Sequence, residues 1–175
     1  MLARLITSTV LLLALAGASA APAPVDTHLP QARQAGAGTF TYFGMKIYDA
    51  QLWVGEKGYQ SGAPFVLDLV YARKLNGVKI AEASADEMAK LNAGTAAQRQ
   101  AWLARMKEIF PDVKEGSRIS GVFLPDSGAR FYLDGKALAS VPDPEFARAF
   151  FAIWLDPATS AKKLRTALLK DAAPR

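Results

Sequence analysis

Two tyrosines and an arginine occupy positions where they could recognise a small molecule. Tyr48 lies in an alternating segment over residues 46–54, and Tyr71 and Arg73 lie in a second one over residues 65–73. Alternation of this kind is typical of β-strands, and it places each of the three beside apolar side chains on one face. Phenolic hydroxyls form hydrogen bonds and a guanidinium binds anions, so the three would suit the polar head of an amphipathic ligand.

The same side chains also have an ordinary structural role. A buried tyrosine commonly donates its hydroxyl proton to a backbone carbonyl, and an arginine at a strand end commonly extends into water. From residue types alone, this structural role is the more frequent one. Both interpretations of Tyr48, Tyr71 and Arg73 therefore stay open, and so does that of Tyr42, which lies in the strand expected before them.

A helix over residues 144–155 is strongly predicted. Asp143 is a suitable N-cap, and Pro144 stands at the first helical position, where proline is tolerated. The helix is apolar almost all round, with large side chains at Phe146, Phe150, Phe151, Ile153, Trp154 and Leu155. Such a helix must be buried against a large surface, and the strands in the middle of the chain provide one.

The remaining elements define the fold class. We expect strands over residues 39–43, 46–54, 65–73, 118–124, 130–133 and in a short segment ending at 139. We expect helices over residues 78–92, from the capping box at Thr95 to the residue before Pro111, over 144–155, and after Pro157 with Thr159 or Ser160 as the cap. Runs of strands separated from runs of helices predict an α+β domain, an antiparallel sheet covered by helices on one face.

The N-terminus has the pattern of a secretory signal peptide. Arg4 precedes an apolar stretch over residues 5–15, and Ala18-Ser19-Ala20 forms a small-x-small cleavage site. The stretch is too short for a committed transmembrane span, and an uncleaved anchor is the less common alternative. We expect residues 1–20 to be removed on export, residues 21–34 to form a flexible N-terminal arm, and residues 35–172 to form one domain.

Composition excludes several kinds of site. The chain has no cysteine, and its one histidine, His28, lies in the expected arm. Disulfides, thiolate metal sites, histidine-dependent hydrolase triads and histidine-ligated zinc or iron are therefore ruled out for the folded body. Gly36-Ala37-Gly38 lacks the third glycine of a dinucleotide-binding loop. We expect no metal and no cofactor.

The chain carries a formal net charge of +5. Four of the positive residues lie in the last predicted helix, at Lys162, Lys163, Arg165 and Lys170. A solvated helix face explains them, and it also suits the helix C-terminus. Contact with anionic lipid or nucleic acid is the alternative, but no aromatic interleaving or arginine cluster accompanies the lysines. We expect no nucleic-acid partner, and the sequence specifies no oligomeric state.

An ordered set of segments resembles the chalcone isomerase-like family, in particular its exported bacterial branch. The resemblance runs from about Leu29 to Lys170. It is carried by Gly36-Ala37-Gly38, the strand around Tyr48, Leu69-Val70-Tyr71-Ala72-Arg73, Asp134-Gly135-Lys136 and the apolar helix with the leucines after it. It implies an open-faced β-sandwich, in which an antiparallel sheet and a layer of helices enclose a ligand cleft, and it implies a periplasmic location.

The resemblance implies two different functions, one for each branch. Chalcone isomerases close a flavanone ring, with an arginine that stabilises the anion and with threonine and tyrosine hydroxyls near the enolate. The fatty-acid-binding branch uses arginine and tyrosine for a carboxylate and performs no isomerase chemistry. In this chain Thr39-Phe40 stand where the catalytic arginine is expected, and Arg33 or Arg73 could replace it by position.

We therefore expect an exported protein that binds a small apolar or amphipathic molecule, such as a fatty acid, through Tyr42, Tyr48, Tyr71 and Arg73. One alternative is an intramolecular lyase of the chalcone isomerase type. Another is a non-catalytic interaction module with a filled core. An open cleft rimmed by the tyrosines favours the first two, whereas a solid interior favours the third.

Overall fold

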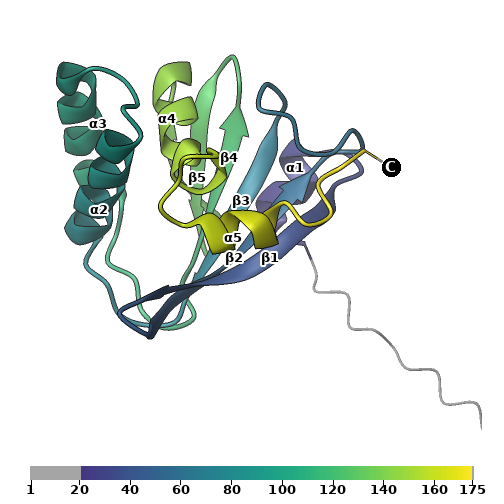
Figure 1. Ribbon diagram of the computed structural model, residues 1–175, viewed down its shortest axis with the longest axis horizontal. Coiled ribbons are helices and arrows are strands. Elements are labelled where there is room, and N and C mark those ends of the chain that lie inside the picture. The colour runs from purple at the N-terminus through teal and green to yellow at the C-terminus, as the bar shows by residue number, and fades with distance from the viewer. Residues whose placement is uncertain (1–20, 175) are drawn as a thin grey trace, which may run out of the picture.

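The structure is a computed structural model that describes residues 21–174 (Figure 1). The signal peptide expected over residues 1–20 lies outside this range. A six-stranded sheet forms the centre, with its strands in the spatial order β1-β2-β3-β4-β5-β6. Every neighbouring pair is antiparallel and adjacent in sequence, so no strand crosses over another.

The elements follow the predicted order. The strands are β1 (Arg33–Tyr42), β2 (Met45–Val54), β3 (Phe65–Tyr71), β4 (Arg118–Leu124), β5 (Gly128–Leu133) and β6 (Lys136–Val141). The helices are α1 (Ala23–His28), α2 (Gly77–Lys90), α3 (Ala96–Ile109), α4 (Pro144–Leu155) and α5 (Lys162–Leu168). The prediction of an α+β domain built on an antiparallel sheet is confirmed.

Helices α2 to α5 form a layer on one face of the sheet (Figure 1). Helix α4 packs on β4 and β5, and α5 packs on β1 and β2. Helix α2 pairs with α3 and contacts α4. The middle of the sheet, around β3, therefore lies between the two helices that rest directly on the strands.

Local hydrogen bonds explain where the helices begin. The Asp143 carboxylate caps α4 by accepting the backbone N–H of Glu145 and Phe146, and it also accepts the indole N–H of Trp102 from α3 at 2.9 Å. The predicted capping box of α3 is present, with Thr95 and Gln98 each bonded to the other's backbone N–H. The hydrogen bond between Trp102 and Asp143 thereby links α3 to the start of α4.

The cap predicted for the last helix is wrong. Helix α5 begins after Ala161, with no side-chain cap. The Thr159 hydroxyl is fully buried and instead donates to the backbone carbonyl of Ile153 at 2.5 Å, and the Ser160 hydroxyl donates to Glu87 at 2.6 Å. Both side chains therefore bind the ends of other helices, because the segment that carries them folds back between α4 and α2.

The segment expected as a flexible arm contains regular secondary structure and buried side chains, and its flexibility stays a prediction. Residues 23–28 form α1, which lies on the sheet face opposite the helix layer, and β1 begins at Arg33. Val25 is fully buried against Trp53, and the small cluster around them also contains Leu29, Val66 and Val122. Trp53 points away from the main helix layer. Helix α1 buries the large apolar surface of Trp53 on that opposite face of the sheet.

Glycines in β1 allow α5 to approach the sheet closely. A Cβ atom on Gly36 would overlap the backbone carbonyl of Ala167 in α5. One on Gly38 would lie 2.9 Å from side-chain atoms of Leu164 and Ala167. Gly36 and Gly38, which form part of an incomplete dinucleotide-loop pattern in the sequence, therefore allow α5 to pack closely on β1.

Gly36→Ala is expected to lower the free energy of unfolding by about 2 kcal/mol or more, because α5 must move away from β1 to admit the methyl group. Urea denaturation measures this loss. Gly62→Ala is the matched control, since open space surrounds Gly62, and we expect it to change stability by less than about 0.5 kcal/mol. Equal effects of the two substitutions would contradict the packing role of Gly36.

Candidate functional site

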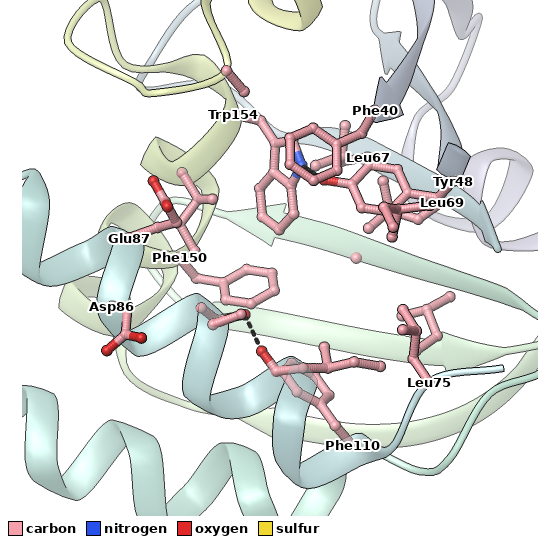
Figure 2. Close-up of a pocket in the computed structure, with 18 of the residues that line it drawn as sticks. Phe40, Tyr48, Leu67, Leu69, Leu75, Asp86, Glu87, Phe110, Phe150 and Trp154 are labelled. Atoms are coloured by element: carbon pink, nitrogen blue, oxygen red, sulfur yellow. Dashed lines mark hydrogen bonds between the residues drawn. The ribbon is translucent and has the colours of Figure 1, made fainter. Parts of the chain in front are cut away.

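A cavity of about 420 Å³ lies between the sheet and the helix layer (Figure 2). Strands β2 to β5 form its floor, and α2 and α4 lie on the other side. Most of its lining is apolar and comes from Leu67, Leu69, Leu75, Ile80, Phe110, Ile119, Phe131, Phe150, Phe151 and Ile153. An apolar lining with a few polar groups is typical of small-molecule sites.

In the described part of the chain, the cavity exists because no helix of the α2–α5 layer packs closely on β3. Leu67 and Leu69 of β3 face the helix layer and meet empty space there. Gly121 of β4 pairs with Leu67 in the sheet and has no side chain to fill the space. A Cβ on Gly121 would lie 3.0 Å from the Phe151 ring, so even an alanine there would press on the wall.

Tyr48 and Trp154 form the polar end of the cavity. The Trp154 indole N–H donates a hydrogen bond of 2.9 Å to the Tyr48 hydroxyl oxygen (Figure 2). The Phe40 ring stacks on Tyr48 with centroids 5.1 Å apart. Burial raises the pKa of the Tyr48 hydroxyl, an effect that the Trp154 hydrogen bond opposes. The hydroxyl therefore keeps its proton near neutral pH and can donate it to a ligand.

Tyr71 supplies a second phenolic proton. Its ring meets the Tyr48 ring edge-on, with centroids 5.8 Å apart, and it also lines the cavity. Burial raises the pKa of this hydroxyl as well. Within residues 21–174 no protein group forms a hydrogen bond with the Tyr71 hydroxyl, in contrast to that of Tyr48. The Tyr71 hydroxyl faces open space in the cavity, where water or a ligand can accept its proton.

The other two predicted site residues occupy different places. Tyr42 lines the cavity near its opening and is 58% exposed. Arg73 is not among the lining residues that the structure describes, and its guanidinium contacts the Met45 sulfur at 3.0 Å. The expectation that Arg73 shares a row with Tyr71 is wrong, because β3 ends at Tyr71 and the alternation ends with it. Recognition of a ligand by the three tyrosines stays a prediction.

Within residues 21–174, no arginine lines the cavity in place of the one that the family resemblance implies for isomerase chemistry. At the expected position, Phe40 stacks on Tyr48, and the Thr39 hydroxyl donates to Asp49 at 2.6 Å. Arg33 donates to the backbone carbonyls of Asp171 and Ala173 in the C-terminal segment. Neither Arg33 nor Arg73 lines the cavity in the described part of the chain.

Charged side chains gather at the opening instead. One face of α2 contributes Lys79, Asp86, Glu87 and Lys90, and Ser160 lies opposite. The Glu87 carboxylate accepts hydrogen bonds from Lys90 at 2.7 Å and from the Ser160 hydroxyl at 2.6 Å. It thereby links α2 to the segment before α5. Partial burial opposes ionisation, but these hydrogen bonds hold the pKa of Glu87 below its ordinary value.

Two site features were not recognised from the sequence. Trp154 was predicted only as an apolar member of α4, although a buried indole N–H requires an acceptor and this requirement is visible in the residue type. The charged rim was also missed. Its signal was the spacing of Lys79, Asp86 and Lys90, which places them along one face of a helix.

Within residues 21–174 no group of three or more histidine, aspartate or glutamate side chains is placed to hold a metal ion. Over the same residues, no helix has both the length and the apolar character needed to span a bilayer.

Comparison with known sequences matches residues 31–170 to the chalcone isomerase-like family. The chain belongs to this family. It is also similar to an uncharacterized protein from Haemophilus influenzae, with 31% identity over 137 residues that cover 77% of this chain and 66% of that relative. The matched region thus spans slightly less than two thirds of the relative's length.

The family's fold is also seen in a solved structure. The chain superposes on the crystal structure of an Arabidopsis thaliana fatty-acid binding protein with a TM-score of 0.64 and 13% sequence identity. The match covers 82% of this chain and 89% of the plant protein. At this identity the likeness establishes the fold, and the expected open-faced β-sandwich with helices over an antiparallel sheet is confirmed.

Tyr48→Phe and Tyr71→Phe are expected to differ in stability although both remove one hydroxyl. Tyr48→Phe leaves the buried Trp154 N–H without its acceptor and should lower the free energy of unfolding by about 1–3 kcal/mol. Tyr71→Phe removes no hydrogen bond seen in the described chain and should change it by less than about 0.5 kcal/mol. Chemical denaturation of both variants measures the difference, and equal losses would contradict these roles.

Glu87→Gln is expected to reduce the acid sensitivity of folding. Because the pKa of Glu87 is lowered from 4.5 in the folded chain, its stabilising contribution is complete above that pH and is lost as the pH falls through the lower folded value. The wild type should therefore lose more stability than Glu87→Gln between about pH 6 and pH 3. Asp86→Asn is the control, and a response equal to that of Glu87→Gln would contradict a specific link through Glu87.

Proposed function

We propose that this protein binds and carries a small apolar or amphipathic molecule in the cavity between its sheet and helices. The observation that carries the proposal is an apolar cavity of about 420 Å³ that contains two buried phenolic hydroxyls. Sites for small molecules commonly have volumes of about 300–1,000 Å³. An interior with this much open space also argues against the alternative of an interaction module with a filled core.

The distribution of charge favours one orientation for an amphipathic ligand. An ionised carboxylate buried beside Tyr48 and Tyr71 would lose its hydration without gaining a cation. Lys79 and Lys90 at the opening form ion pairs with Glu82 and Glu87, and by exchanging these partners they can pair with such a group while it stays in contact with water. A fatty acid would therefore place its hydrocarbon chain inside and its carboxylate at the opening. The interior hydroxyls suit a neutral acceptor, such as a carbonyl or hydroxyl oxygen.

The site supports binding better than isomerisation. Ring closure of a chalcone requires stabilisation of a developing anion, and removal of one such donor commonly costs a few kcal/mol of barrier. The described lining offers three tyrosine hydroxyls for this purpose, one of them at the opening, and no arginine. The structural likeness to a fatty-acid binding protein makes fatty acids the first ligands to test.

We further propose that the protein acts after export to the periplasm. The support is the N-terminal pattern of Arg4, an apolar stretch and the Ala18-Ser19-Ala20 site. Native mass spectrometry of the protein from the periplasmic fraction tests location and binding together. We expect a chain that begins at Ala21 and carries a bound small molecule.

Filling the cavity is expected to weaken ligand binding. Leu69→Phe adds a ring on the floor of the cavity and removes space for several methylene groups. The affinity for fatty acids, measured by displacement of an apolar dye, should fall about tenfold or more. Val70→Phe is the matched control, since the adjacent residue in β3 points to the other face of the sheet. Equal affinities of both variants would refute binding in this cavity.

Two further measurements separate binding from catalysis. Tyr71→Phe should lower the affinity for a ligand that accepts a hydrogen bond in the interior by about threefold to tenfold. The stability of the variant should equal that of the wild type. Conversion of chalcone to flavanone should proceed no faster with the protein than in buffer. A faster rate that is lost in Tyr71→Phe would support the isomerase alternative instead.

A further inference from the structure

The turn between β1 and β2 exposes an unusual amount of apolar surface. Phe43 is 85% exposed, Tyr42 is 58% exposed and Met45 is 47% exposed. These are three of the four large apolar side chains that are exposed in the described part of the chain. Figure 1 shows this turn projecting from the end of the sheet on the side of α2. We refer to residues 42–45 as the hairpin tip.

Phe43 is unfavourable for the isolated chain in two ways. Phe43 and Gly44 both have positive φ, at 46° and 74°, as in the tight turns that favour Asn-Gly or Asp-Gly. The β5–β6 turn has the same pattern with φ values of 50° and 80°, and there the residues are Asp134-Gly135. A phenylalanine in this conformation is disfavoured, and its ring gains almost no burial in return.

The hairpin tip lies at the opening of the cavity. Tyr42 belongs both to the tip and to the cavity lining. Phe40 and Ile47, which flank the tip on β1 and β2, line the cavity as well. A surface that receives Phe43 would therefore lie next to the entrance through which an apolar ligand must pass.

Basic residues lie beside the tip and directly after β3 in the sequence. Lys46 follows the tip in β2, and the Arg73 guanidinium reaches the Met45 sulfur at 3.0 Å. Lys74 is the exposed neighbour of Arg73. Within residues 21–174 no carboxylate lies at ion-pair distance from Arg73 or Lys74, whereas Lys46 pairs with Asp49 at 2.6 Å. Exposed aromatic side chains beside basic residues are the combination that binds the interface of an anionic bilayer.

We propose that the hairpin tip docks on the surface of an anionic phospholipid membrane, with the cavity opening against the lipid. The Phe43 ring enters the interfacial region, and Arg73 and Lys74 contact the phosphate-bearing head groups. An apolar ligand can then pass between the bilayer and the cavity without crossing bulk water. This inference concerns the source of the ligand, and it goes beyond the proposed function.

The test is cosedimentation with lipid vesicles, using the protein as its host processes it. We expect binding to vesicles of phosphatidylcholine and phosphatidylglycerol in equal parts, weaker binding at high salt, and little binding to phosphatidylcholine alone. Phe43→Asn should lower the vesicle partition coefficient about tenfold, because the variant has no apolar ring to transfer from water to the lipid. Lys74→Gln should weaken it about fivefold. Lys57→Gln, at the other end of β2, is the charge-matched control and should leave partitioning unchanged.

A stability measurement makes the test specific. Asparagine suits the turn better than phenylalanine, so Phe43→Asn should be at least as stable as the wild type although it binds vesicles less well. Absence of wild-type binding to the anionic vesicles would overturn the proposal, as would equal binding by Phe43→Asn. A concentration-dependent dimer that Phe43→Asn abolishes, with no vesicle binding, would overturn it and assign the tip to self-association.

The outcome is independent of the proposed carrier function. Phe43 does not line the cavity, so dye displacement by fatty acids without vesicles should be the same in Phe43→Asn and in the wild type. Loss of vesicle binding with intact dye displacement supports the docking role of the tip. Vesicle binding without any dye displacement would refute the carrier function and leave the docking role in place.

Discussion

The architecture depends on the burial of a helix that is apolar on nearly every side. A six-stranded sheet is roughly 24 Å wide, whereas a helix with its side chains is about 10 Å across. Helix α4 can therefore cover only part of the sheet, and it packs on β4 and β5 while α5 covers β1 and β2. The space over β3 is the consequence. The Trp154 indole N–H, which faces this space from α4, requires an acceptor, and Tyr48 of β2 supplies it.

The polar groups of the site are separated by depth. The interior contains phenolic hydroxyls, which burial keeps protonated, and the ionised side chains of α2 stay at the opening. This separation follows from the cost of burying an unpaired charge, which is far higher than that of burying a hydroxyl. The cavity therefore suits an apolar body with neutral polar atoms inside and a charged group, if there is one, at the rim.

Much of the fold was predictable because its signals are local. Asp143 and the capping box at Thr95 marked two helix starts correctly, and strand alternation placed Tyr48 and Tyr71 on the helix side of the sheet. The prediction that Arg73 continues the row of Tyr71 was wrong, and the helix α1 within the expected arm was not predicted. In both cases the local pattern ended or was too short, and tertiary contacts decided the conformation: the burial of Val25 and Leu29 against Trp53 holds α1 in place.

By itself, the sequence determined the elements, their order, the side chains on each face of the sheet and the absence of histidine and cysteine chemistry from the body of the fold. These properties depend on residue type and short-range periodicity. Only the tertiary structure decided that a cavity remains over β3 and that Trp154 binds Tyr48. It also decided that, among residues 21–174, the Tyr71 hydroxyl has no protein partner and no arginine lines the cavity. Those properties depend on how helices of fixed width are distributed over a wider sheet, which no local pattern records.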